Sequence, residues 1–260
     1  MNMLLFSISM SKKVTTSWGG VADWYSEYLT LEDSYQAKVI LPNVVRLLEP
    51  LAGRKLIDVA CGEGYFSRAF AKAGAKVVGA DIAPELIAKA KEAGGGVQYY
   101  VAPAEKLQFA TTAQFDIAVC VLALQNIDDI GKVFKEVHRV LKPKGTFVFV
   151  LNHPAFRVLK RSSWVYDEGH HQQYRRIDGY LSSAKITVDM HPGKRGRSKT
   201  VSYHRSIQDF SKALFNAGFT IDRIEEWTSH KTSEKGPRQK AEDTARKEIP
   251  LFMALQASLR

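Results

Sequence analysis

Cysteine is scarce in this chain, with two residues in 260, Cys61 and Cys120. Two cysteines rule out a disulfide scaffold, so we expect a reducing, cytoplasmic environment. Long apolar runs are missing as well, since none approaches the roughly 18 residues that a membrane-spanning helix needs. The apolar opening MNMLLFSISM has no basic segment before it. We therefore expect no signal peptide, a start of translation at either Met1 or Met10, and disorder over residues 1–17.

Acidic residues are outnumbered: 27 Asp and Glu stand against 37 Lys and Arg, a formal net charge of +10. Such a balance is compatible with a nucleic-acid partner. However, much of the excess lies in two runs, residues 194–199 and 235–240, that are not interleaved with aromatic side chains. This pattern favours two solvated loops, with a channel for an anionic substrate or a membrane surface as the alternative. We do not expect a nucleic-acid partner.

Recognised metal-ligand spacing is also missing. His170 and His171 lie next to Asp167 and Glu168, which are suitable ligand types. Adjacent histidines in an extended segment point to opposite sides, however, and the four residues match no known metal-binding pattern. We therefore expect no metal site.

The chain is organised around residues 55–81, which have the pattern strand, glycine-containing turn, helix and second strand. Gly62 and Gly64 bracket Glu63 where the first strand must turn into the helix. Without side chains they allow unusual backbone torsions and let a ligand lie against the backbone. Asp81 ends the second strand, where a carboxylate is placed to accept hydrogen bonds from both hydroxyls of a ribose. The segment predicts a nucleoside site.

A third small residue is missing from this turn. A dinucleotide fingerprint, G-x-G-x-x-G/A, needs one for close helix packing over a pyrophosphate. Here Ser67 stands at that position, Tyr65 and Phe66 crowd the helix start, and Glu63 brings a negative charge. The turn therefore favours a nucleoside without phosphates, of which S-adenosylmethionine is one.

The segment DVACGEG, residues 58–64, resembles motif I of the class I S-adenosylmethionine-dependent methyltransferases, and Asp81 matches their ribose-binding acid. The segments FDIAVC (115–120) and EVHRVLKPKG (136–145) are similar to signatures of the small-molecule branch that contains the quinone-biosynthesis enzymes. The resemblance implies an α/β, Rossmann-like fold with seven strands in the order 3-2-1-4-5-7-6. It also implies methyl transfer by in-line displacement, with S-adenosylhomocysteine as product.

The resemblance also implies site residues. Asp58 would orient the methionine amino group, the backbone around Ala60 to Gly64 would cradle the methionyl part, and Asp81 would hold the ribose. A tyrosine of the N-terminal segment closes over the cofactor in relatives, and Tyr25 matches it. The full expected cofactor set is Tyr25, Asp58, Ala60, Cys61, Gly62, Gly64, Asp81, Ile82, Ala104, Glu105 and Leu122.

One position departs from the family pattern. Relatives carry an aspartate that recognises the adenine amino group where Pro103 stands here. A proline side chain cannot accept that hydrogen bond, so we expect Glu105 or a backbone atom to replace it. The N/D-P-P-Y/F motif of amino-directed nucleic-acid methyltransferases is absent after residue 121, which argues against nucleobase amines as acceptors.

The remaining chain suggests a substrate lid. We expect N-terminal helices and the cofactor-binding core over residues 18–151, a lid inserted over 152–206, and completion of the sheet over 207–260. Histidines and aromatic residues accumulate in the lid, which favours a small apolar or aromatic acceptor. As the base that removes a proton we expect His153, with His170 and His204 as the next candidates. RNA or protein methylation, or a regulator that binds the cofactor without turnover, are the alternatives.

Local patterns predict the individual elements. Residues 229–247 look like a polar surface connection. Residues 185–190 and 200–203 look like a hairpin in the lid. Sheet strands are expected at 56–59, 76–80, 97–101, 115–121, 146–151, 219–227 and 249–257, and helices at 65–73, 85–92, 130–141 and 207–217. The acceptor's identity, its attacking atom and the oligomeric state stay open.

Overall fold

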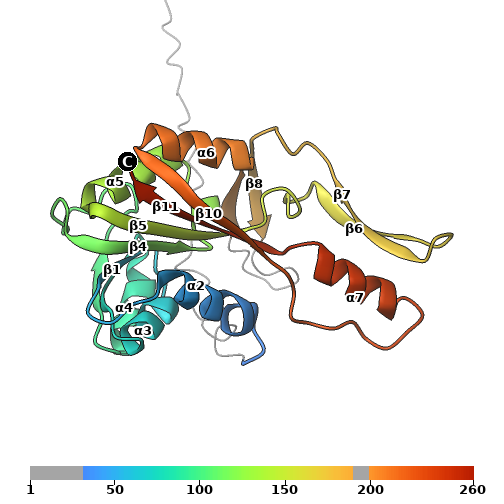
Figure 1. The fold of residues 1–260 in the computed structure, drawn as a ribbon, viewed down its shortest axis with the longest axis horizontal. Coiled ribbons are helices and arrows are strands. Elements are labelled where there is room, and N and C mark those ends of the chain that lie inside the picture. The colour runs from blue at the N-terminus through green and yellow to red at the C-terminus, as the bar shows by residue number, and fades with distance from the viewer. Residues whose placement is uncertain (1–31, 190–198) are drawn as a thin grey trace, which may run out of the picture.

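The computed structural model of the protein describes residues 32–189 and 199–260. A seven-stranded sheet lies in the centre, with helices on both of its faces (Figure 1). The helices are η2 (Gln36–Ile40), α2 (Leu41–Leu48), α3 (Tyr65–Lys72), α4 (Pro84–Glu92), η3 (Leu124–Asn126), α5 (Ile130–Val140), α6 (Ile207–Asn216) and α7 (Gln239–Glu248). The strands are β1 (Lys55–Val59), β2 (Lys76–Asp81), β3 (Gln98–Val101), β4 (Phe115–Val121), β5 (Leu141–Asn152), β6 (Ser162–Asp167), β7 (Gln172–Ile177), β8 (Ala184–Asp189), β9 (Lys199–His204), β10 (Phe219–Trp227) and β11 (Phe252–Leu259).

The strand order across the large sheet is β10-β11-β5-β4-β1-β2-β3. Strands β1 to β5 pair in parallel, whereas β11 runs antiparallel between β5 and β10. The predicted order is therefore confirmed, with β10 and β11 as the sixth and seventh strands. The chain reverses its direction of travel across the sheet between β1 and β4. Ligands of open α/β sheets bind beyond the carboxyl ends of the strands at such a switch point.

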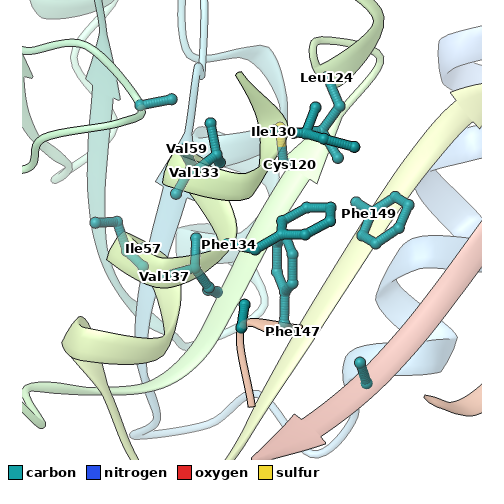
Figure 2. Packing of buried hydrophobic residues seen from close by; sticks show 14 of the residues in the cluster. Ile57, Val59, Cys120, Leu124, Ile130, Val133, Phe134, Val137, Phe147 and Phe149 are labelled. Atoms are coloured by element: carbon teal, nitrogen blue, oxygen red, sulfur yellow. The ribbon is translucent and has the colours of Figure 1, made fainter. Parts of the chain in front are cut away.

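Helix α5 follows its predicted periodicity, because its apolar residues recur at helical spacing and are all buried. Its Phe134 packs against Phe147 and Phe149 of β5, with ring centroids 5.6 Å away in each case. Figure 2 shows this aromatic group together with aliphatic side chains of β1 and α5. The opposite face of the sheet is covered by η2, α2 and α3. Both faces of the central strands are thus buried, as their near-continuous apolar runs predict.

The boundary between α5 and β5 differs slightly from the prediction. The helix ends at Val140 and the strand begins at Leu141, before the stretch Lys142 to Gly145 that was expected to separate them. The pairing register between β4 and β5 shifts across this stretch. A break in the ladder accommodates Pro143, which has no N–H to donate.

The segment between β5 and α6 holds two hairpins. The predicted hairpin is present as β8 and β9. The hairpin β6–β7 was missed, because its strands are only partly buried and lack an alternating apolar pattern. The prediction that 229–247 is only a surface connection was wrong, since α7 begins within it at Gln239. This helix is polar on nearly all sides and lies along β7, away from the sheet (Figure 1), so tertiary packing rather than local pattern decides it.

Candidate functional site

The β1–α3 turn lies at the switch point of the sheet and has an unusual backbone. Ala60, Gly62 and Gly64 all have positive φ, at 58°, 56° and 76°. A Cβ atom added to Gly62 would meet nothing within 4 Å, so open space lies beside this residue. A Cβ atom on Gly64 would lie 2.2 Å from the hydroxyl of Tyr99. Gly62 therefore leaves room for a ligand, whereas Gly64 is required by the packing of Tyr99.

Asp81 joins two turns at the end of β2. Its Oδ2 atom accepts a hydrogen bond from the N–H of Gly62 at 2.8 Å, and its Oδ1 atom accepts one from the N–H of Ala83 at 2.9 Å. Burial raises the pKa of this carboxyl, although the backbone donors partly offset the rise. Each carboxylate oxygen has a second lone pair, so the group can accept further hydroxyl donors.

Asp58 lies deeper, on β1, and is almost fully buried. Ser67 of α3 donates a hydrogen bond of 2.5 Å to its Oδ2 atom. Burial raises the pKa of Asp58 to about 7, nearby Asp81 adds to the rise, and the Ser67 hydroxyl opposes it. Burial also raises the pKa of the Cys61 thiol well above its ordinary value. Cys61 is consequently a neutral thiol here rather than a nucleophile.

A hollow of about 660 Å³ lies between Glu105 and the residues Asp128 to Lys132 at the start of α5. Ala104 is buried and Glu105 is half-buried, while Ile82, directly after Asp81, is 63% exposed. An exposed isoleucine directly after Asp81 offers an apolar face to a ligand.

Glu136 and Arg139 lie one turn apart on α5 and contact each other. The two side chains form an ion pair of 2.6 Å on α5. Glu136 also accepts the N–H of Leu107, and Arg139 donates to the carbonyls of Leu107 and Ala110. The pair therefore fastens the loop that carries Ala104 and Glu105 onto α5.

The loop after β4 begins with a strained residue. Leu122 has a positive φ of 54°, and its N–H donates to Val150. Arg205, which follows β9, donates hydrogen bonds to three carbonyls of this loop, at Leu124, Ile127 and Asp128. The β8–β9 hairpin is thus fastened to the loop that follows β4, beside the switch point.

The three histidines expected as bases are all hydrogen-bonded within the protein. In His153 the Nδ1 atom accepts the N–H groups of Ala155 and Phe156, and Nε2 lies 2.6 Å from a carboxylate oxygen of Glu226. These contacts fix the tautomer that donates from Nε2 to Glu226. Burial lowers the pKa of His153.

His170 and His204 lie in the two hairpins. His170 is exposed near the β6–β7 turn and contacts Asp167 at 3.0 Å. His204 is buried on β9, and its Nε2 atom lies 2.7 Å from the carbonyl oxygen of Tyr180. The structure therefore does not bring the three histidines together.

Tyr25, the segment 1–17 and most of the basic run 194–199 lie outside the described residues. Within the described ranges, no helix is long and apolar enough to cross a membrane, and no three His, Cys, Asp or Glu side chains are grouped as metal ligands. Sequence reasoning did not find the roles of Tyr99 and Arg205. Ser67 was noted only as the residue that replaces a third glycine, and its contact with Asp58 explains its presence.

The sheet order and the turns at its switch point define the class I S-adenosylmethionine-dependent methyltransferases, and comparison with known proteins agrees. A sequence profile described as "Methyltransferase domain" matches residues 57–149. Demethylmenaquinone methyltransferase of Chlorobaculum tepidum is 30% identical over 200 residues, which cover 76% of this chain and 78% of that protein. Ubiquinone biosynthesis O-methyltransferase of Methylococcus capsulatus is 38% identical over 130 residues, 48% of this chain and 55% of its own length. The crystal structure of an S-adenosylmethionine-dependent methyltransferase from Mesorhizobium loti aligns with a TM-score of 0.66 and 29% identity, covering 84% of this chain and 96% of that one.

The chain belongs to the class I S-adenosylmethionine-dependent methyltransferases, and S-adenosylmethionine is its cofactor. The residues present fit this group. Open space beside Gly62 admits a ligand against the backbone, and the spare lone pairs of Asp81 suit the two hydroxyls of a ribose. Buried Asp58 is a carboxylate that a nearby ammonium group would favour in its charged form.

Proposed function

We propose that this enzyme transfers the methyl group of S-adenosylmethionine to a small apolar or aromatic acceptor. Two curated relatives are named as methyltransferases of quinone biosynthesis, and quinone precursors are molecules of this kind. The observation that carries the cofactor part of the proposal is the bridging carboxylate of Asp81, which accepts hydrogen bonds from the N–H groups of Gly62 and Ala83. The aromatic residues of the lid segment support an acceptor with apolar surface.

In this proposal each part of the site has one task. Asp81 accepts the ribose hydroxyls, Asp58 orients the methionine amino group, and the backbone from Ala60 through Cys61 and Gly62 to Gly64 lies along the methionyl part. The cofactor supplies an activated methyl group when bound, so the chain need not provide a nucleophile.

The adenine side has a different set of residues. Ile82 offers its exposed face to the ring, and Ala104 and Glu105 follow Pro103, which replaces the family's aspartate; Glu105 lines the hollow beside α5. Leu122 begins the loop beside the transferable methyl group. Tyr25 is proposed to close over the cofactor.

The protein's task toward the acceptor is to hold the attacking atom in line with the methyl group and to remove a proton where the acceptor is a hydroxyl, thiol or activated carbon. His153, His170 and His204 remain predictions for that base. Each histidine must break a hydrogen bond within the protein and contact the acceptor before it can take a proton. The role of residues 152–206 as a lid is likewise a proposal, supported by the attachment of Arg205 to the loop after β4.

The test is transfer of radiolabelled methyl from S-adenosylmethionine into an extract of the source cells, with the products divided among organic solvent, small polar solutes and macromolecules. Wild type is compared with Asp81→Ala and Asp81→Asn, and with Asp222→Ala, an exposed aspartate on β10 outside the cofactor site and the lid, as the matched control. We expect label in the small-molecule fractions from wild type and control, and at least a tenfold loss with either Asp81 variant.

Label in RNA or protein would overturn the small-molecule proposal. Absence of label in every fraction, with S-adenosylhomocysteine still raising the melting temperature, would instead point to a regulator that binds the cofactor without turnover.

A further inference from the structure

Three arginines from distant parts of the chain come together beyond the carboxyl end of β5. Arg157 follows that strand, Arg175 lies on β7 and Arg246 lies on α7. The guanidinium carbons of Arg157 and Arg175 lie 5.6 and 5.1 Å from the ring centroid of Trp164. All three side chains are half-buried. We refer to Arg157, Arg175 and Arg246 as the arginine cluster.

The members of the arginine cluster differ in their partners. Arg175 donates to the carbonyl of Phe156 and to the hydroxyl of Ser162, and Arg246 donates to the hydroxyl of Ser233. The Nε atom of Arg157 is buried and makes no hydrogen bond. Within residues 32–189 and 199–260, none of the three forms an ion pair with a carboxylate, although exposed arginines such as Arg176 and Arg238 do.

This arrangement is electrostatically unfavourable without a partner. Burial lowers the pKa of Arg157 to about 10, and the charges of Arg175 and Arg246 add to the effect. Buried polar groups in native proteins are nearly always paired, so the unpartnered Nε atom of Arg157 requires an explanation. Planar guanidinium groups match carboxylate and phosphate oxygens in geometry as well as charge, and such charge-assisted hydrogen bonds are strong.

The arginine cluster lies on the side of the sheet where an acceptor would enter. The N–H of Arg157 donates to the carbonyl of His153, immediately after β5. Strand β5 is the neighbour of β4, whose following residue Leu122 begins the loop at the switch point. Arg246 also borders a hollow of about 550 Å³, whose lining includes Glu234 and Glu242. Arg157 thus follows a strand that ends at the same edge of the sheet as the switch point, and no member of the cluster is among the residues proposed for the cofactor.

We propose that the arginine cluster binds an anionic oxygen group, a carboxylate or a phosphate, carried by the methyl acceptor. This inference rests on the proposed function and narrows it, since the acceptor then has an acidic end as well as an apolar or aromatic part. Three converging, half-buried arginines suit one small anion, whereas nucleic-acid binding uses an extended basic stripe that follows a backbone.

The test is calorimetric titration of the full chain, saturated with S-adenosylhomocysteine, with benzoate in one arm and inorganic phosphate in the other. Arg157→Gln is the main variant, because it removes a charge whose Nε atom makes no hydrogen bond. Arg246→Gln is the second variant. The matched control is Arg176→Gln, which replaces an exposed arginine next to Arg175 on β7. Binding of S-adenosylhomocysteine to each variant is measured alongside.

We expect wild type and Arg176→Gln to bind benzoate or phosphate, and the dissociation constant to rise at least tenfold in Arg157→Gln and Arg246→Gln. The arm that responds identifies carboxylate or phosphate as the recognised group. S-adenosylhomocysteine affinity should stay within about twofold in all variants.

The inference would be overturned if Arg157→Gln bound the anions as tightly as wild type, or if wild type bound neither anion. It would also be overturned if, in a further titration, wild type bound RNA oligomers but neither small anion. None of these results would affect the cofactor site. Failure of wild type to bind S-adenosylhomocysteine would overturn the proposed function itself.

Discussion

Replacing Asp58 by asparagine tests the electrostatics of the cofactor site through folding stability. Asp58 is 2% exposed, and its pKa is raised from 3.8 to about 7. The folded protein therefore holds a proton on Asp58 between about pH 4 and pH 7, where the unfolded chain has released it. The free energy of unfolding must fall as the pH rises through this window and level off above it. At about 1.4 kcal/mol per pH unit the loss amounts to about 4 kcal/mol.

Asparagine has a similar shape, keeps an oxygen that accepts the Ser67 hydroxyl, and carries no charge at any pH. We therefore expect Asp58→Asn to match wild type at about pH 4 and to be more stable by about 4 kcal/mol at about pH 8. Urea unfolding across this pH range measures the difference, with Asp178→Asn as an exposed control. Parallel stability curves for wild type and Asp58→Asn would refute the reasoning.

The same variant separates stability from cofactor binding. If Asp58 orients the methionine amino group, its ionised form is the one that binds the ammonium. The affinity of wild type for S-adenosylhomocysteine should then rise with pH up to about 7, and that dependence should be absent in Asp58→Asn. An unchanged pH dependence in the variant would remove Asp58 from the binding site and leave the stability argument standing.

Three further substitutions test the local structure. Gly62→Ala should cost about 1–2 kcal/mol of stability, the strain of a positive φ, and should weaken S-adenosylhomocysteine binding because the methyl group enters the open space. Gly64→Ala should cost about 1–3 kcal/mol more, because its Cβ overlaps Tyr99, and equal denaturation midpoints for the two variants would contradict this packing. Ser206→Ala removes the capping box that Ser206 forms with Asp209 at the start of α6, so we expect a loss of about 1 kcal/mol. In the same urea titrations, Ser211→Ala inside that helix should be close to neutral, and a loss equal to that of Ser206→Ala would argue against the cap.

The sequence alone determined the parts of the protein whose signal is local. The glycine turn at 58–64, the acid at Asp81 and the periodicity of α5 each lie within a few residues, where backbone torsions, strand ends and helix faces are set by neighbours along the chain. The capping box of Ser206 and Asp209 likewise lies within three residues of the chain. The order of the motifs along the chain also identified the family. The strand order followed from the family and could not be predicted from composition.

Only the tertiary structure decided which residues meet across the fold. His153 is hydrogen-bonded to Glu226, which lies 73 positions away in the sequence. The side chain of Tyr99 on β3 leaves no room for a Cβ atom at Gly64. The arginine cluster joins the segment after β5 to β7 and α7, neither of which the local pattern predicted. Such contacts depend on how whole elements pack. The sequence of a polar helix or a half-buried hairpin has no apolar periodicity from which its packing partners could be predicted. The glycine turn and Asp81 could therefore be predicted from the sequence, whereas the arginine cluster forms only when distant segments pack together.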